Sequence, residues 1–336
     1  MGMHFRSRDG NILRTIYAYD GMLHIRHIHE IFFPGKTVRP VQRRLQKMVE
    51  SEYLRRPTEE QWNSRPSSRG LYWLDWKGIL YVAERAGIDV EPPKKSSKEK
   101  LRLFNRRLQK HNVHWRREPR WSQIAHDMRV ADFRIALERS VGQLPYLYLE
   151  IWLHEGYFKS GGEADTVYYN VEGGDGKVRQ GKKKVCPDSY FKIVNTERLA
   201  RGQKARARFS LEIDMANHPG GRFGLDKVAA GGSWILSPEY KARFGFNGGR
   251  WLVVTTSRKR MNNLMRHAQQ MGGKLTKLFF FSTFDQYEYK EGASDGDQVR
   301  PPNVMTDPIW WQCERAEPVA LVPEMYRREV KVDGML

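Results

Sequence analysis

The chain changes character near residue 120, and this change predicts a fold with two dissimilar parts. Before that point, apolar residues recur mostly at helical spacing, and cationic residues lie between them. From Trp121 onward, apolar runs of strand length alternate with helical segments, which is the pattern of an α/β or α+β fold. The 336 residues are enough for about two domains.

The N-terminal part is predicted to contain three short helices followed by a β-hairpin and a further helix. These elements are expected at residues 11–20, 24–33, 37 onward, 53–56, 71–74 and 75–86. The two strands flank a polar loop, and Thr37 is a suitable N-cap for the third helix. Three helices followed by a hairpin is the order of a winged helix-turn-helix, whose third helix enters the major groove of DNA. We therefore predict such a DNA-binding domain over residues 8–87.

The charge of the chain predicts a polyanionic partner. The formal net charge is +19, and residues 1–120 contain 26 Lys and Arg against 13 Asp and Glu. We expect double-stranded DNA to contact the third helix and the hairpin, through Lys36, Arg39, Arg43, Arg44, Lys47, Arg55, Arg56, Arg65 and Arg69. The alternative is a basic face that is only solvated.

The C-terminal part is predicted to be a mixed-sheet domain. Helices are expected at 124–141, 224–241 and 259–271, and strands at 147–153, 184–194, 207–215, 251–256 and 277–284. The order α-β-β-β-α-β, followed by one more helix and strand, is that of a restriction-endonuclease-like core. We assign residues 88–120 to a basic linker or helix, 121–290 to this domain and 291–336 to a C-terminal extension.

Asp188, Glu212, Asp214 and Lys227 are the candidate catalytic residues. Two carboxylates on neighbouring strands, followed by a lysine, is the order in which a metal-dependent nuclease assembles its site, and we expect Mg²⁺ or Mn²⁺ on Asp188, Glu212 and Asp214. Strand alternation places Glu212 and Asp214 on one face. Such cores usually carry Glu-x-Lys where this chain has Glu-x-Asp, so Asp214 is a third ligand or a base and Lys227 supplies the positive charge. The alternative is that Asp188 is an ordinary turn residue, that Glu212 and Asp214 face solvent on an edge strand, and that Lys227 is a surface lysine.

Other features limit the class of protein. The two cysteines, Cys186 and Cys313, are too few for a disulfide framework or a zinc ribbon. No apolar run approaches the roughly 18–20 residues that span a bilayer, and residues 1–10 have no apolar signal-peptide segment. We therefore expect a cytoplasmic protein that does not act at a membrane.

Short motifs in both parts resemble the replication-relaxation family of plasmids and other mobile elements. They are Leu71–Gly78, Cys186–Phe191 and Phe209–Asp214, with Lys227 downstream, and the resemblance covers residues 10–285. It implies a prokaryotic protein that acts on DNA during replication or transfer, with a PD-(D/E)XK nuclease-like second domain. It also implies that Asp188, Glu212, Asp214 and Lys227 are the functional positions. Other replication, transfer or transposition proteins are further candidate partners.

These observations lead to one main hypothesis and two alternatives. The main hypothesis is a metal-dependent DNA nuclease or nickase that acts in replication or transfer. One alternative is a catalytically inactive DNA-binding regulator of replication or transcription. The other is an assembly component of a larger DNA machine, suggested by the aromatic segments Phe279–Phe281 and Trp310-Trp311.

Overall fold

The computed structural model describes residues 3–92, 98–159, 165–172, 178–217, 220–287 and 301–322. The chain divides into two compact units, an N-terminal unit (Met1–Ala131) and a C-terminal unit (Asp132–Leu336). The boundary lies within one long helix, α7 (Ile124–Gly142). Parts of the predicted linker (93–97) and of the predicted C-terminal extension (291–300 and 323–336) lie outside the described residues.

The N-terminal unit begins with helices and strands that form a small antiparallel sheet. Its elements are α1 (Ser7–Ala18), β1 (Met22–His24), α2 (Ile25–Phe32), α3 (Val38–Glu50), β2 (Leu54–Arg55), α4 (Glu59–Ser64), η1 (Pro66–Ser68), β3 (Leu71–Leu74), α5 (Trp76–Arg85) and α6 (Lys98–Lys110). Among the described residues, β3 is the middle strand and pairs antiparallel with β1 and with β2. The three predicted helices, the two strands and the helix after them are confirmed.

Helical spacing produces the core of the N-terminal unit. On α3, Val41, Leu45 and Met48 recur every three or four residues, and all three are fully buried. On α1, Ile12 and Ile16 are also fully buried. The opposite face of α3 is therefore left to polar and charged residues.

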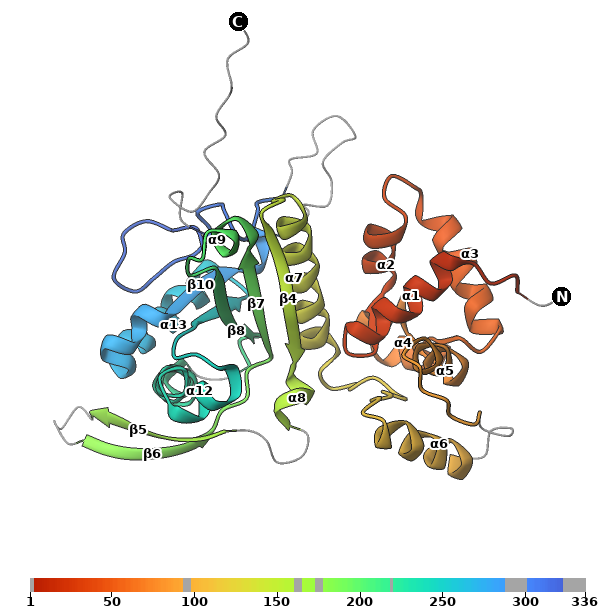
Figure 1. Cartoon of the computed structure of the whole chain (residues 1–336), viewed down its shortest axis with the longest axis horizontal. Helices are drawn as coiled ribbons and strands as arrows, with labels where there is room; N and C mark the ends of the chain where they lie inside the picture. The colour runs from red at the N-terminus through yellow and green to blue at the C-terminus, as the bar shows by residue number, and fades with distance from the viewer. Residues whose placement is uncertain are drawn as a thin grey trace, which may run out of the picture. The chain divides into compact units, whose positions relative to one another are not determined.

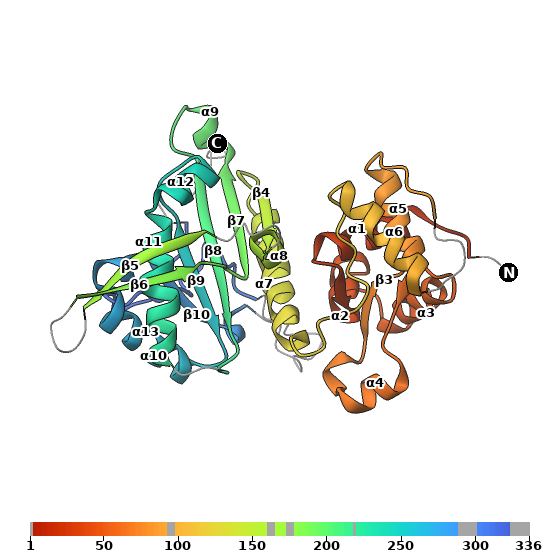
Figure 2. The same ribbon diagram turned by 90° about the horizontal axis from the view of Figure 1, so that it is seen from below.

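A short strand and a short α-helix of the N-terminal unit were not predicted. The short strand β1 occupies Met22–His24, because Leu23 and its neighbours pair with β3 and do not begin the next helix. The supposed polar loop between β2 and β3 contains α4, which Figure 2 shows projecting from the rest of the unit. Thr58 and Gln61 form a capping box at its start, in which the Thr58 hydroxyl accepts the Gln61 N–H at 3.3 Å and the Gln61 amide accepts the Thr58 N–H at 2.9 Å.

The C-terminal unit is built on a mixed sheet. After α7 come β4 (Leu147–His154), α8 (Glu155–Lys159), β5 (Thr166–Glu172), β6 (Val178–Lys184), β7 (Ser189–Asn195), α9 (Thr196–Ala200), β8 (Arg206–Asp214), α10 (Gly220–Phe223), η3 (Gly224–Ala229), α11 (Ala230–Ile235), α12 (Pro238–Phe244), β9 (Arg250–Thr255), α13 (Arg258–Gly272), η4 (Gly273–Leu278), β10 (Phe279–Thr283) and η5 (Phe284–Gln286). Within the described ranges, five strands lie in the order β10-β9-β8-β7-β4. Strands β4, β7 and β8 are antiparallel neighbours, whereas β8, β9 and β10 run parallel.

Helices cover both faces of this sheet (Figure 1). On one face, the ring of Phe133 from α7 lies 6.0 Å from that of Phe191 on β7. On the other face, Trp234 of α11 and Leu264 of α13 share a buried cluster with Trp251 of β9. The hairpin β5–β6 crosses α11 on this second side (Figure 2). The predicted α/β class with a mixed sheet is confirmed.

The segment predicted as one strand over residues 184–194 is two strands. Lys184 ends β6 and Ser189 begins β7, and the residues between them, which include Pro187, are not in a strand. The pairing of β5 with β6 was not predicted, because their polar residues hide the alternation that a strand buried on one face would show.

The aromatic segments near the C-terminus belong to the core. Phe279–Phe281 form most of β10, and Phe279, Phe281 and Trp310 are fully buried. A search of the described helices finds none that is long and apolar enough to span a membrane.

Candidate active site

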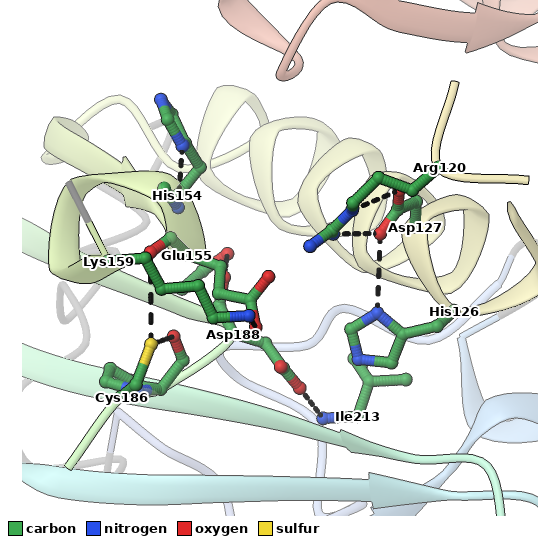
Figure 3. A network of polar contacts seen from close by, with 12 residues as sticks. Arg120, His126, Asp127, His154, Glu155, Lys159, Cys186, Asp188 and Ile213 are labelled. Atoms are coloured by element: carbon green, nitrogen blue, oxygen red, sulfur yellow. Dashed lines mark hydrogen bonds and ion pairs between the residues drawn. The ribbon is translucent and has the colours of Figure 1, made fainter. Parts of the chain in front are cut away.

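Asp188 lies where two central strands of the sheet come together. It immediately precedes β7, and its backbone N–H donates to the carbonyl of Leu211 on β8 at 3.0 Å. Its carboxylate Oδ2 accepts the backbone N–H of Ile213 at 2.7 Å (Figure 3). Asp188 is only 8% exposed. These two contacts hold Asp188 against the stretch of β8 that contains Glu212.

Glu212 is buried and paired with a lysine from another element. Its carboxylate Oε2 accepts a hydrogen bond from Lys227 Nζ at 2.7 Å. Lys227 lies in η3, a π-helical turn between α10 and α11. Such turns are rare and are frequently found at functional sites. Asp188, Glu212 and Lys227, which are far apart in the sequence, therefore belong to one cluster.

The charges of this cluster keep Lys227 protonated. Burial alone would lower the pKa of Lys227, but the carboxylates of Glu212 and Asp188 outweigh it and raise the pKa above its ordinary value. Lys227 can consequently stabilise negative charge near neutral pH and cannot serve there as a general base.

Asp214 takes part in a different set of contacts. Its carboxylate accepts two hydrogen bonds from the Arg260 guanidinium of α13, at 2.8 and 2.9 Å, and one from the Thr255 hydroxyl at 2.6 Å. The two hydrogen bonds between the guanidinium and the carboxylate are charge-assisted and therefore strong. It ties the end of β8 to α13, so Asp214 has a structural role that its place in the sequence did not suggest.

Additional polar residues surround Asp188. Glu155 and Lys159 lie on α8 and form an ion pair with each other. The Cys186 thiol lies 3.9 Å from the carbonyl of Glu155, and both residues are drawn with Asp188 in Figure 3. Glu155 and Lys159 were not predicted. Their position directly after β4 is the signal that could have identified them, because β4 pairs with β7 at the end where Asp188 lies.

The arrangement of acidic groups limits how a metal ion could be held. The part of the chain that the structure describes contains no group of three or more His, Cys, Asp or Glu side chains that could together hold a metal ion. Asp188 and Glu212 together offer hard oxygen donors. Mg²⁺ commonly uses only one or two carboxylates and retains water molecules, so Asp188 and Glu212 are the residues that could hold such an ion.

The predicted DNA-contact residues of the N-terminal unit differ in their surroundings. Most of them are exposed, namely Lys36, Arg39, Arg43, Lys47, Arg56, Arg65 and Arg69. Arg44 is instead held by Asp9, whose side chain is 1% exposed, and Arg44 Nε donates to Asp9 Oδ1 at 2.7 Å. Arg55 pairs with Glu118 at 3.0 Å in an exposed contact. Arg44 and Arg55 therefore already have acidic partners.

Both thiols should react slowly with alkylating agents in the folded protein. Burial, assisted by Glu155, raises the pKa of Cys186 to about 11 against the opposing charges of Lys159 and Lys227, and burial also raises the pKa of Cys313 to about 11. At pH 7 each thiol should then contain on the order of 100-fold less thiolate than an ordinary cysteine. Iodoacetamide labelling with and without denaturant measures this difference. Equal rates in the two conditions would contradict it.

The fold and the site together define a two-unit α/β protein with an Asp–Glu–Lys cluster at the junction of two central strands. The sequence model of the replication-relaxation family matches residues 13–223, and this chain belongs to that family. The match includes Asp188, Glu212 and Asp214 and ends before Lys227. Neither the curated proteins nor the solved structures give a significant match. Family membership indicates a role in replication or relaxation of plasmids or other mobile elements and implies interaction with DNA.

Proposed function

We propose that this protein is a metal-dependent DNA nuclease or nickase of a mobile genetic element. The observation that carries the proposal is the cluster of Asp188, Glu212 and Lys227, in which two buried carboxylates, one just before β7 and one on β8, lie near the same lysine. Burying charged groups together costs free energy unless they are paired or serve a function, and two carboxylates with an ammonium group suit phosphodiester hydrolysis.

The element order supports specific folds for the two units. In the C-terminal unit, α7 precedes three antiparallel strands, and helices then lead to β9, which is parallel to β8. We propose that this is a restriction-endonuclease-like core of the PD-(D/E)XK kind, with its lysine moved from the strand to η3. In the N-terminal unit, we propose a winged helix in which α3 is the recognition helix and the β2–β3 segment, with α4 inserted, is the wing.

Asp188 and Glu212 would hold the cation, which we propose to be Mg²⁺ or Mn²⁺. When bound, such an ion lowers the pKa of water and polarises the phosphodiester. Asp188 is oriented by the Ile213 N–H, and Glu212 by Lys227. Asp214 is not included in the proposed ligand set, because Arg260 and Thr255 bind its carboxylate. Lys227 would stabilise negative charge that develops on the phosphate.

Incubation with supercoiled plasmid tests this proposal. The full-length protein is incubated with Mg²⁺, with Mn²⁺ or with EDTA, beside the Asp188→Ala and Glu212→Ala variants. We expect nicked or linear product only with a divalent ion and only from the unaltered protein. Unchanged cleavage by Asp188→Ala would overturn the proposal.

A second candidate function is DNA binding without catalysis. It is favoured by the ion pair between Asp214 and Arg260, because this aspartate occupies the strand position where such nucleases usually carry a lysine. A regulator of this kind would retard plasmid in all three incubations and leave it intact. Its affinity for DNA would fall steeply with salt, since phosphate contacts release counterions.

A further inference from the structure

A groove in the N-terminal unit combines an apolar floor with a cationic rim. Its volume is about 570 Å³, within the range of about 300–1,000 Å³ that is usual for small-ligand sites. It lies between α3 and the segment that runs from β2 through α4 to β3. The half-buried side chains of Ile25 and Trp62 contribute apolar surface to it. The groove is therefore suited in size and surface to a flat, partly apolar ligand.

The charge of the groove is all of one sign. Arg43, Arg56 and Arg69 line it, and no Asp or Glu is among the described residues that do. All three arginines are exposed, and within the described ranges none of them forms an ion pair with a carboxylate. Unpaired cations around an apolar floor select a ligand that carries negative charge beside a flat apolar group.

Trp62 is the central aromatic residue of the groove. The guanidinium carbons of Arg56 and Arg69 each lie 5.7 Å from the centre of its ring. Its indole N–H is buried and has no hydrogen-bond partner among the described residues. This N–H has almost no accessible surface, so a ligand in the groove would instead meet the half-buried ring of Trp62 and the two guanidinium groups beside it.

We propose that this groove binds one unpaired nucleotide of a DNA strand. The base would lie against Trp62, and the adjoining phosphates would contact Arg43, Arg56 and Arg69. A duplex cannot offer the face of a base to Trp62, because neighbouring bases cover it, whereas an unpaired base can stack on aromatic and guanidinium planes. This inference rests on the proposal that the N-terminal unit binds DNA. It adds that the groove distinguishes unpaired from paired DNA.

Binding measurements with three DNAs of equal length test the inference. The first is a duplex, the second carries one unpaired nucleotide, and the third carries an abasic residue at that position. The full-length protein is used in EDTA, so that cleavage plays no part. We expect the unpaired nucleotide to be bound roughly tenfold more tightly than the abasic residue, which is a typical effect of stacking on one aromatic side chain.

Substitutions test whether the preference for an unpaired nucleotide arises in the groove. Trp62→Ala should bind the second and third DNAs equally, whereas Trp62→Phe, which keeps an aromatic ring, should retain most of the preference. The control Arg39→Gln, on the exposed part of α3 outside the groove, should weaken binding of all three DNAs alike.

Two results would overturn the inference alone: duplex binding by the unaltered protein with no preference for the unpaired base, or a preference that survives Trp62→Ala. Failure to bind any of the three DNAs would overturn both this inference and the proposed function. The comparison between unpaired and abasic DNA in the unaltered protein is decisive even if Trp62→Ala does not fold.

Discussion

Replacing Arg44 with alanine is expected to reduce the free energy of unfolding of the N-terminal unit by about 3–5 kcal/mol, the cost typical of leaving a buried charge without its partner. Asp9 is 1% exposed and receives two hydrogen bonds from the Arg44 guanidinium. Without Arg44, the Asp9 carboxylate must stay buried with only the Arg6 backbone N–H as a donor, or move into water. Each of these responses destabilises the packing of α1 against the rest of the unit.

Hydrogen exchange of the amides in α1 and α3 measures this effect in the full-length protein. Arg43→Ala is the matched control, because Arg43 is the neighbouring residue, is exposed and has no acidic partner among the described residues. The control should change stability by less than about 0.5 kcal/mol, as is usual for surface substitutions. Similar exchange rates for the two variants would show that the Asp9–Arg44 pair contributes little.

Replacing Lys227 with methionine should reduce the rate of metal-dependent DNA nicking by about 10²- to 10³-fold, the range found when one group that stabilises transition-state charge is removed. Methionine keeps much of the length of the side chain and removes the charge that pairs with Glu212. DNA binding in EDTA should be unchanged. The variant Lys227→Arg should recover part of the rate, because it restores a positive charge. A nicking rate equal to that of the unaltered protein would remove Lys227 from the proposed mechanism.

The pH dependence of this site follows from the direction of the pKa shift. The pKa of Lys227 is raised above its ordinary value of 10.5. The stability that its pairing with Glu212 contributes is therefore fully present below pH 10.5 and is lost only as the pH rises through the raised pKa. In the metal-free protein, the contribution of this pair to stability should therefore stay constant between pH 8 and 10. Thermal unfolding of the unaltered protein and of Lys227→Met across this pH range tests whether Lys227 stays protonated.

Local periodicity was sufficient to predict the longer elements. The helices α3 and α13 have apolar residues at helical spacing, and β9 and β10 are short apolar runs. In contrast, β1 has three residues, too few to show a period, and the capping box of α4 lies among polar residues that resemble a loop. The break between β6 and β7 was hidden because Val185 and Cys186, which lie between the two strands, are apolar like the residues of β7.

Contacts within the candidate site were predictable from the sequence only between residues that two neighbouring strands bring together. Asp188 and Glu212 are brought to the same end of the sheet because β7 pairs with β8 with Ser189 opposite Leu211. The partner of Asp214 is Arg260, 46 residues further along, and the partner of Arg44 is Asp9, 35 residues earlier. Such pairs depend on how helices pack, and no local pattern specifies them. For the same reason Trp62 was not predicted, since the groove it lines forms only when α3 and α4 come together.

Titration with Mn²⁺, followed by electron paramagnetic resonance of the free ion, tests the proposed metal site and does not depend on finding the right DNA. We expect one Mn²⁺ site in the full-length protein that is lost in Asp188→Asn and in Glu212→Gln. Glu150→Gln is the control, since Glu150 is a carboxylate on β4 that is also paired with a lysine, Lys192. Absence of binding, or equal binding in all four proteins, would contradict a metal site at Asp188 and Glu212.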